Sequence, residues 1–159
     1  MKNDNIRMDK ARLTFLGTGT SQGVPMIGCG CEVCRSSDPR DKRLRASALV
    51  EWCGMRILVD AGPDFRQQML RERVTHLDAI LLTHNHKDHT GGLDDIRAFN
   101  YLERRASEIF CEEYVEESLR KEYSYAFAEK KYPGAPEWDI HIIDDRPFLI
   151  NGVEIVPIR

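Results

Sequence analysis

The most informative run of the sequence is Thr83-His84-Asn85-His86-Lys87-Asp88-His89-Thr90-Gly91-Gly92. It places three imidazoles and one carboxylate within six positions, directly after the apolar run Ala79-Ile80-Leu81-Leu82. The chain has five histidines, so three of them in six residues indicate a metal site rather than the composition of a solvated turn. The apolar run is typical of a buried strand. The candidate ligands therefore follow the C-terminal edge of a strand, and we expect Gly91 and Gly92 to let substrate or metal-bound water approach the backbone there.

The spacing of the four candidate ligands predicts two metal ions side by side. His84 and His86 are two residues apart, so in an extended segment their side chains leave the same face and can bind one ion. Asp88 and His89 follow a bend and can reach a second ion. Imidazole and carboxylate ligands suit zinc, with manganese or iron as weaker options. Two such ions would lower the pKa of a bridging water and hold the oxygen of the electrophile, which indicates hydrolysis.

The composition is that of an ordinary globular domain. The chain has 159 residues, is 42% hydrophobic and carries a formal net charge of −3, so it can bury one core and has no global attraction to nucleic acid. No apolar run approaches the roughly 20 residues of a membrane span, and the polar leader expected over residues 1–11 lacks the apolar core of a signal peptide. Five cysteines cannot all pair with one another. We therefore expect a cytoplasmic protein without a membrane partner, in which residues 12–159 belong to one domain.

Hydrophobic periodicity and turn residues predict strands that alternate with helices. Residues 46–52 and 55–59 form a hairpin around Cys53-Gly54 that ends at Asp60. Helical spacing is present in 65–74, 93–101 and 112–131, whereas the charged segment 35–45 has no apolar periodicity and is expected to be loop. The other expected strands are 12–16, 77–82, 108–111, 138–143, 148–150 and 153–158, the last two joined by a turn at Asn151-Gly152.

Three cysteines in the run Gly28-Cys29-Gly30-Cys31-Glu32-Val33-Cys34 form a second candidate metal site. Three thiolates within six residues supply most of a tetrahedral zinc site and need one further ligand. The alternatives are a redox pair at Cys31 and Cys34, or thiols without a ligand role. Cys53 and Cys111 stand singly in apolar strands, where we expect them to fill space in the core.

The remaining titratable residues are expected to be structural. The basic residues of the segment 35–45 could contact a phosphorylated substrate, but the acidic residues between them favour a solvated loop face. His76 precedes a strand and His141 lies within one. Neither has another ligand type at useful spacing, so both are expected to be structural histidines.

The segment from Thr83 to Gly92 resembles the H-x-H-x-D-H signature of the metallo-β-lactamase superfamily. The resemblance implies an α/β fold, the αββα sandwich of that superfamily, represented here mainly by its N-terminal half. It implies that His84 and His86 bind one zinc ion, that Asp88 and His89 bind a second, and that Asp88 also has a catalytic role. Manganese is the alternative metal. Asp60 would brace the cluster through hydrogen bonds, and an ordinary turn residue is the alternative at that position.

The run from Leu16 to Pro25, followed by the three cysteines, is similar to the PhnP-type phosphoribosyl cyclic phosphodiesterases over residues 12–159. Because members of that branch place a structural zinc ion at such a cluster, Cys29, Cys31 and Cys34 are expected to bind a third zinc, with a histidine from the second half of the fold. The implied activity is hydrolysis of a small (cyclic) phosphodiester through a metal-bound hydroxide. The alternatives are an RNA-end phosphodiesterase of the same superfamily and a non-catalytic metal-binding fragment.

The final run, Val153 to Arg159, resembles the strand after which the superfamily places its next metal-binding histidine. The missing ligands are therefore expected beyond Arg159. The resemblance then implies that this chain alone is an inefficient catalyst, because four ligands shared by two ions leave each ion with too few. It also implies an uncovered apolar sheet face and, through it, self-association.

Overall fold

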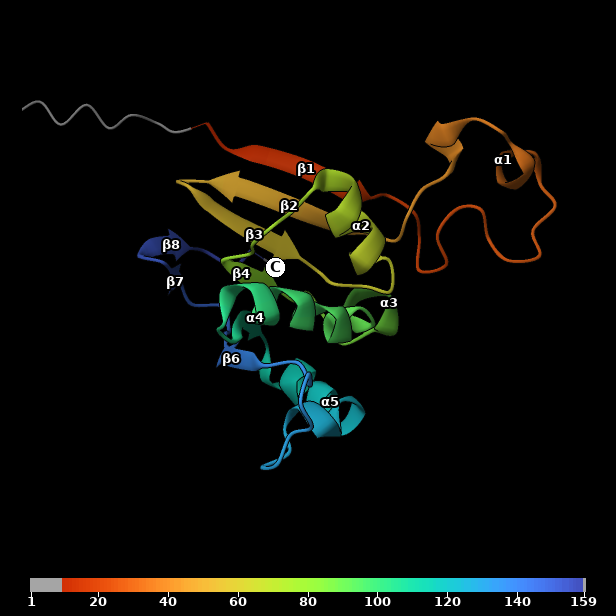
Figure 1. The fold of residues 1–159 in the computed structure, drawn as a ribbon. Helices are drawn as coiled ribbons and strands as arrows, with labels where there is room; N and C mark the ends of the chain where they lie inside the picture. Colours follow the sequence, from red (N-terminus) through yellow and green to blue (C-terminus); the bar gives the residue numbers. More distant parts are fainter. Residues whose placement is uncertain (1–9, 159) are drawn as a thin grey trace, which may run out of the picture.

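Six strands form one sheet in the computed structural model, which describes residues 10–158 (Figure 1). The strand order in the sheet is β1-β2-β3-β4-β5-β6, the same as the order along the chain. Residues 1–9 of the expected leader lie outside the described residues. The strands are β1 (Arg12–Gly17), β2 (Ser47–Trp52), β3 (Met55–Val59), β4 (Ala79–Leu81), β5 (Ser107–Cys111) and β6 (Trp138–Ile142).

The first three strands form an antiparallel meander. β2 and β3 are joined at Cys53 and Gly54, whose φ angles of 50° and 77° are the left-handed pair that a two-residue hairpin turn requires. The register pairs Trp52 with Met55 across the strands. The hairpin expected from the sequence is confirmed, and it brings Asp60 to the end of the sheet at which the histidine motif begins.

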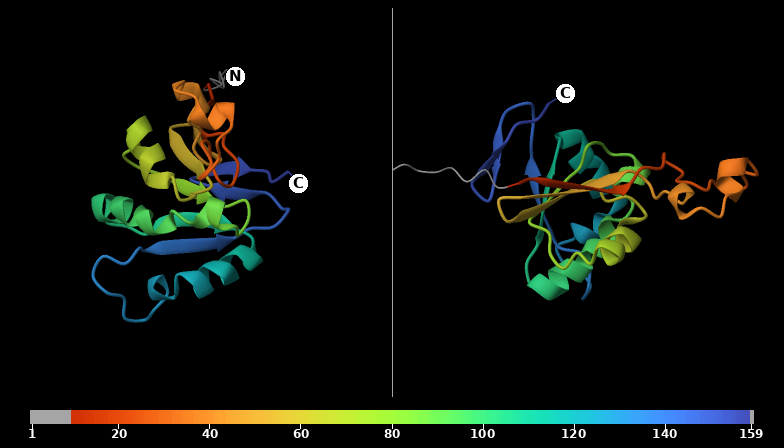
Figure 2. Two further views of the ribbon diagram at one scale, coloured as in Figure 1. Left: turned by 90° about the vertical axis from the view of Figure 1, so that its right-hand side faces the viewer. Right: turned by 90° about the horizontal axis from the view of Figure 1, so that it is seen from above.

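The remaining strands add in parallel, because each is reached through a helical crossover on the same face of the sheet (Figure 2). The apolar faces of these helices pack on the sheet in a core that includes Phe65, Ile80, Phe99 and Leu119. A strand buried under such a layer is continuously apolar, as β4 is. The crossovers contain α2 (Phe65–Glu72), then α3 (Lys87–Thr90), η2 (Leu93–Ile96) and α4 (Arg97–Glu103), and finally α5 (Glu113–Glu122).

A small second sheet, β7 (Phe148–Ile150) and β8 (Val153–Ile155), packs on the opposite face of the main sheet. It shares a second, smaller core with Ile57, Ala79 and Phe110. Its turn at Asn151 and Gly152 has φ angles of 48° and 81°, as the sequence predicts. The layers are therefore helices, a mixed sheet and a small second sheet, which is the arrangement expected for one half of an αββα sandwich.

The helix predicted over 112–131 is wrong at its C-terminal end. It stops at Glu122, after which η3 (Ser124–Ala126) turns the chain. Ring contacts give the physical reason: Tyr123 and Phe127 both meet Trp138 edge-on, at centroid distances of 5.2 and 5.6 Å. Tertiary packing of these rings has overridden a helical pattern that continues through Phe127.

Three smaller differences concern the bounds of short elements. The segment 35–45, expected to be loop, contains η1 (Pro39–Asp41), which begins where the Asp38 carboxylate accepts the Arg40 N–H, and it follows the one-turn helix α1 (Glu32–Arg35). The helix expected over 93–101 is divided between η2 and α4, and the strand expected over 153–158 ends at Ile155. Within residues 10–158, no helix is long and apolar enough to cross a membrane.

Candidate metal centre

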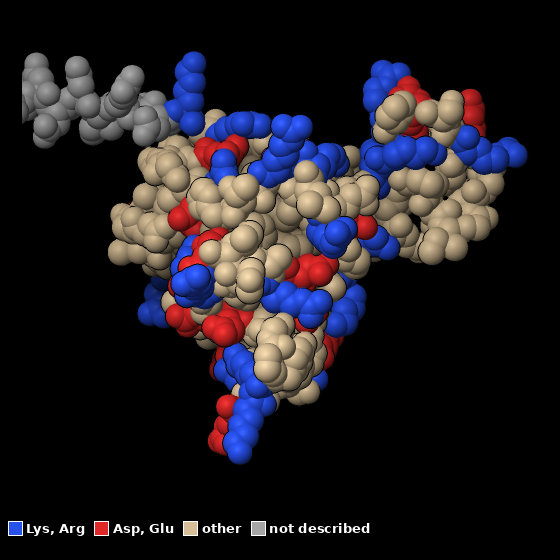
Figure 3. Space-filling view, in the orientation of Figure 1, with Lys and Arg blue, Asp and Glu red and all other residues tan. Residues whose placement is uncertain are grey.

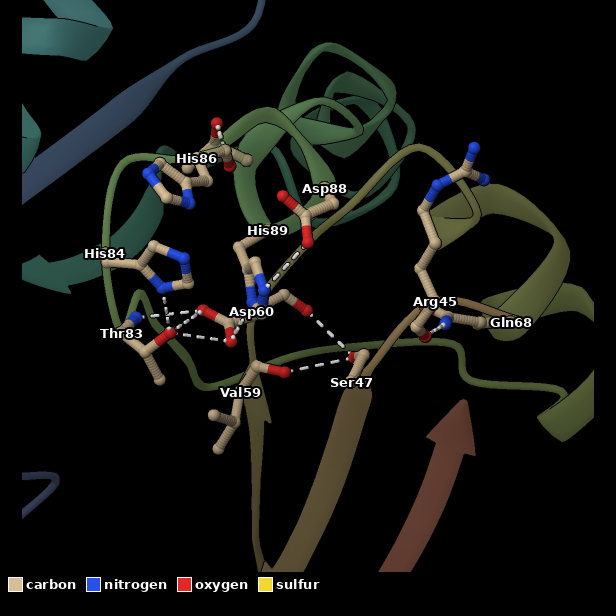
Figure 4. A network of polar contacts seen from close by, with 11 residues as sticks. Arg45, Ser47, Val59, Asp60, Gln68, Thr83, His84, His86, Asp88 and His89 are labelled. Atoms are coloured by element: carbon tan, nitrogen blue, oxygen red, sulfur yellow. Dashed lines mark hydrogen bonds and ion pairs between the residues drawn. The ribbon is translucent and has the colours of Figure 1, made fainter. Parts of the chain in front are cut away.

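Four potential ligands gather where β4 gives way to the one-turn helix α3 (Figure 4). The loop after Leu81 carries His84 and His86, and α3 carries Asp88 and His89. The ring centroid of His84 lies 4.6 Å from that of His86 and 4.1 Å from that of His89. The structure therefore brings together the three imidazoles of the motif.

Asp88 and His89 place their donor atoms where one ion could bind both. Oδ2 of Asp88 lies 3.1 Å from Nε2 of His89. Two ligands bonded to zinc at about 2.0–2.2 Å in tetrahedral geometry are about 3.3–3.6 Å apart, so only a small adjustment is needed. No three of the four donor groups fall within 4.8 Å of one another. The donor types suit a divalent metal ion such as zinc.

Asp60 is buried beside this pair, with 5% of its surface exposed. Its Oδ2 accepts a hydrogen bond from Nδ1 of His89 at 2.7 Å, which leaves Nε2 of the ring available as a ligand. The same carboxylate accepts hydrogen bonds from the Thr83 backbone N–H and from the Thr83 hydroxyl, each at 2.8 Å. These are the contacts that the expected bracing role of Asp60 requires.

A left-handed backbone conformation directs the Asp60 side chain toward the ligands. Its φ is +61°, a conformation that costs a residue with a Cβ roughly 1–2 kcal/mol. The Asp60 N–H donates to the Leu81 carbonyl oxygen at 2.9 Å, and the Ser47 hydroxyl lies 2.8 Å from the Asp60 carbonyl oxygen and 3.0 Å from that of Val59. Contacts from two neighbouring strands therefore hold the strained residue in place.

Glycines let the two backbone segments around the ligands touch. A Cβ on Gly62 would lie 2.0 Å from the Asp88 carbonyl oxygen, and one on Gly92 would lie 2.1 Å from the Gly62 carbonyl oxygen. Between them, Ala61 donates its N–H to the His89 carbonyl oxygen and accepts the Gly92 N–H, both at 2.8 Å. The expectation that Gly92 makes room for substrate is wrong, because it is buried and its missing side chain serves backbone packing.

The surroundings of His84 favour its neutral ring. Burial lowers the pKa of His84 below its usual range, and the neighbouring rings of His89 and His86 lower it further. Its Nδ1 lies 2.9 Å from Oγ1 of Thr83. Because the Thr83 hydroxyl proton is directed to Asp60, we assign Nδ1 as the donor in this contact. Nε2 of His84 is then unprotonated, which is the form that binds a metal.

Helix α5 and the residue that follows it, Tyr123, support the ligand segment from the helical layer. The buried Tyr123 hydroxyl donates to the Thr90 carbonyl oxygen at 2.9 Å, and Nδ2 of Asn85 donates to the Ser118 hydroxyl at 2.8 Å. Each contact joins residues 33 positions apart, so no local sequence signal indicates it. Sequence reasoning therefore missed these supporting residues.

The three cysteines of the second candidate site lie on an arm that projects from the sheet (Figure 1). Their sulfur atoms lie within 4.8 Å of one another, and all three are free thiols. The backbone N–H of Cys34, together with the Cys29 thiol, lowers the pKa of Cys31, which favours the thiolate that zinc binds. The group fits three ligands of a zinc site, and among residues 10–158 no fourth ligand joins it.

The two single cysteines differ from each other. Cys111 is fully buried, as expected for a core residue, and this burial raises the pKa of its thiol to about 12. Cys53 is exposed in the β2–β3 turn, so the expectation that it fills space in the core is wrong. The hairpin turn needs its left-handed backbone and turns the side chain to solvent.

Basic and acidic side chains are interspersed on the face shown in Figure 3. On the arm, Arg40 pairs with Asp38 at the surface, as a solvated loop face predicts. Arg45 does not fit that expectation, because its side chain is only 28% exposed. It forms an ion pair with Asp64 at 2.9 Å and donates from Nε to the Ser21 carbonyl oxygen at 2.9 Å. Arg45 therefore ties the glycine-rich loop after β1 to the start of α2.

Two histidines lie outside the cluster. His76 is beside Arg56 and Asp78, at 3.4 and 3.7 Å, as expected for a structural histidine. The expectation that His141 has no other ligand type at useful spacing is wrong. Pairing of β5 with β6 places Glu108 and Asp139 next to it.

Comparison with known proteins gives a family match and several structural matches. The family model of the Beta-lactamase superfamily domain matches residues 55–159. The crystal structure of a diphosphatase from the PhnP family superposes with a TM-score of 0.83 at 39% identity, over 92% of this chain and 56% of that chain. Zn²⁺-bound PqqB from Methylobacterium extorquens superposes with a TM-score of 0.66 at 22% identity, over 89% of this chain and 48% of its own. At that identity the second match concerns the fold alone.

The curated relatives carry two different names. An octanoyltransferase of Porphyromonas gingivalis is 45% identical over 150 residues, which are 93% of this chain and 30% of that protein. A coenzyme PQQ synthesis protein B of Methylorubrum populi is 36% identical over 99 residues, which are 54% of this chain and 33% of that protein. The chain spans about a third of the length of these relatives and about half of the solved chains. Their names therefore describe longer proteins.

Proposed function

Because this chain belongs to the β-lactamase superfamily, we propose that the protein is a metal-dependent hydrolase that cleaves a phosphorus–oxygen bond in a small phosphorylated substrate. One observation carries the proposal. The donor atoms of Asp88 and His89 lie 3.1 Å apart, while the other ring nitrogen of His89 is held by the buried Asp60 carboxylate. This is the arrangement of a ligand pair whose orientation is set before a metal binds.

Each residue of the cluster has a proposed role. His84 and His86 would hold one divalent cation, and Asp88 and His89 a second, with zinc as the first choice and manganese as the alternative. When bound, the two cations lower the pKa of a water and neutralise charge on the phosphoryl oxygens. Asp60 keeps His89 in the tautomer whose Nε2 faces Asp88.

Asp88 is also proposed to act on the attacking water. Its Oδ2 faces His89, whereas its Oδ1 has no hydrogen bond or ion pair among the described residues. A carboxylate oxygen with open acceptor positions can accept a hydrogen bond from a water and orient it toward phosphorus. Asp88 would therefore combine the roles of ligand and catalytic residue.

A small cyclic phosphodiester is the first proposed substrate, and a diphosphate is the second. The first rests on the similarity of the loop from Leu16 to Pro25 and of the cysteine cluster to the cyclic phosphodiesterase branch. The second rests on the PhnP-family diphosphatase, which is 39% identical. Both substrates present charged non-bridging oxygens that a two-cation site neutralises. The same site therefore suits either bond.

Two other activities have less support. RNA-end hydrolysis would call for a basic surface, whereas positive and negative side chains alternate on the face shown in Figure 3. Octanoyl transfer is the name of a relative of which this chain matches 30%, and the cluster of imidazoles and carboxylates suits metal-assisted hydrolysis instead. We also propose a cytoplasmic setting, in which the three free thiols of the arm remain available to zinc.

The test is a hydrolysis assay on the protein expressed from its complete reading frame, loaded with zinc or with manganese. Bis(p-nitrophenyl) phosphate probes diester cleavage, a dinucleoside diphosphate probes the anhydride, and p-nitrophenyl phosphate is the monoester control. D88N is expected to lower the rate by at least about a hundredfold, as loss of a metal ligand that also orients water should. H76Q is the matched control and should keep the wild-type rate. Absence of turnover of both diester and anhydride with either metal would overturn the proposal.

A further inference from the structure

Two carboxylates and one imidazole meet on the sheet face that carries the β7–β8 hairpin, and they share no residue with the candidate metal centre. Asp139 and His141 are two residues apart on β6, so their side chains leave the same face of the sheet. The parallel register places Glu108 of β5 directly beside Asp139. One donor atom from each of the three residues lies within 4.8 Å of the other two.

The orientation of the His141 ring is fixed from one side. The ring stacks on Phe110 with a centroid distance of 4.6 Å and an interplanar angle of 22°. Phe110 in turn stacks on Phe148 of β7 at 5.3 Å. With its plane set by this stack, His141 directs Nε2 to Oε2 of Glu108 at 2.5 Å. A ligand nitrogen and a carboxylate oxygen are therefore held together by the surrounding packing.

The charges of the group are not balanced. Glu108 and Asp139 are neighbours across two paired strands, an arrangement in which like charges destabilise the sheet. Within residues 10–158, neither carboxylate pairs with a lysine or an arginine, and Asp139 makes no hydrogen bond at all. Among the described residues, the His141 ring is the one ion-pair partner of Glu108, and Asp139 has none. A cation bound by all three residues would remove this repulsion.

We propose that Glu108, Asp139 and His141 bind a zinc ion that joins β5 to β6. One imidazole nitrogen and two carboxylate oxygens form a set of three protein ligands that zinc accepts, with water in the fourth position. The side chains of His141 and Glu108 are 40% and 34% exposed, so water can reach that position. Magnesium and calcium prefer sites made of oxygen ligands alone. The two carboxylates match the charge of a divalent cation when the imidazole is neutral.

Zinc binding by the complete protein tests this site directly. Equilibrium dialysis against zinc is expected to show one ion fewer per chain for H141Q and for D139N than for the wild type, at a zinc concentration that just saturates the wild type. Removal of one of three ligands should weaken this ion by at least about tenfold. The Asp139 side chain is exposed and makes no hydrogen bond or ion pair among residues 10–158, so D139N removes a ligand without disturbing the fold, which circular dichroism checks. H76Q is the matched control, because His76 lies near the Asp78 carboxylate but belongs to no group of three potential ligands among the described residues.

Cadmium-113 NMR gives a second readout that separates the sites by their donor atoms. Cadmium at the three cysteines resonates apart from cadmium bound only by nitrogen and oxygen. H141Q should remove one nitrogen–oxygen resonance and leave the sulfur resonance in place. The same zinc count and the same cadmium spectrum in the wild type, H141Q and D139N would overturn the proposal, and so would displacement of this zinc by excess magnesium. The proposed site shares no ligand with the His84 to His89 cluster. Loss of zinc binding here can therefore occur with hydrolysis retained, and loss of hydrolysis can occur with zinc binding here retained.

Discussion

The carboxylate of Asp60 lies 2.7 Å from Nδ1 of His89, and only 7% of the Asp60 side chain is exposed. The contact joins the residue that follows β3 to the helix that carries two of the four candidate ligands. Asp60 makes this contact from a left-handed backbone conformation, with φ +61°, that strands rarely contain. The strained residue at the end of β3 thereby sets the direction of a ligand on the crossover that follows β4.

Asp60→Asn should weaken the metal centre. The introduced amide has one oxygen and one NH2 group where the Asp60 carboxylate has two acceptor oxygens. Its NH2 group would face a donor, either Nδ1–H of His89 or those of Thr83. One buried hydrogen bond is therefore lost, and the ring of His89 is held less firmly. We expect zinc affinity at this centre to fall by about 10–100-fold, and the free energy of unfolding to fall by about 1–3 kcal/mol. Competition with a chromophoric chelator and urea unfolding measure the two effects. D144N, in an exposed ion pair with Arg146, is the control, and equal zinc affinity in D60N and the wild type would contradict the bracing role.

Gly62→Ala should separate the two segments that hold the ligands. The new Cβ would lie 2.0 Å from the Asp88 carbonyl oxygen, and backbone on both sides cannot swing away as a side chain could. Overpacking of this kind costs about 1–3 kcal/mol or more, and displacement of Asp88 should lower metal affinity as well. Urea unfolding compares this variant with Gly30→Ala, whose Cβ would meet nothing within 4 Å. A G62A protein as stable as G30A would show that the close approach is not required.

Tyr123→Phe should change stability at alkaline pH. Burial raises the pKa of Tyr123 to about 12, with further contributions from Glu122 and Asp94, against about 10 in an unfolded chain. A raised folded-state pKa gives stability that is fully present below about pH 10 and is lost as the pH rises toward 12. Y123F should therefore lose about 1 kcal/mol near pH 7, where Thr90 loses its donor, and should show a shallower decline between pH 10 and 12.

Unfolding free energies measured from pH 7 to pH 12 test this expectation. Tyr101→Phe is the control, since the Tyr101 ring is 85% exposed and supports nothing in the core. An alkaline decline as steep in Y123F as in the wild type would mean that other groups account for it. Cys111 is the main candidate for such a group, because burial also raises its pKa to about 12.

Cys34→Ser should remove zinc from the arm without affecting the candidate centre. Cobalt substituted for zinc at Cys29, Cys31 and Cys34 should give sulfur-to-cobalt charge-transfer absorption in the near ultraviolet, because thiolates are its ligands. C34S should lose most of this band and bind cobalt there at least about tenfold more weakly. C53S changes a thiol that is exposed in a turn and should leave the band intact. Equal bands in C34S and the wild type would contradict the thiolate site.

The parts of the molecule that the sequence predicts well are those with local causes. The hairpin at Cys53 and Gly54 depends on two adjacent residues, and the ligands from His84 to His89 lie within six positions. Short spacing on a known backbone type determines which side chains share a face. For such features, the local sequence is enough to predict which side chains lie together.

The parts that the sequence did not predict depend on contacts between distant segments. Glu108 meets His141 only because β5 and β6 pair in one parallel register, and register is set by the whole sheet rather than by either strand. The C-terminal end of α5 depends on the position of the Trp138 ring, which Tyr123 contacts. The burial of Arg45 depends on its ion pair with Asp64. Periodicity describes one segment at a time and contains none of these relations.

The sheet order, in which every strand pairs with the one before it in the chain, also bears on how the protein is made. As the chain leaves the ribosome, each new strand finds its partner already in place, so no early strand has to wait for a late one. Pairing with the preceding strand also keeps the loop-closure entropy of each step below that of pairing between strands at opposite ends of the chain. Asp60 and the His84 to His89 segment emerge before β5 and β6 exist. The ligand-bearing segments can therefore meet early in synthesis, before Ser118 and Tyr123 are available to support them.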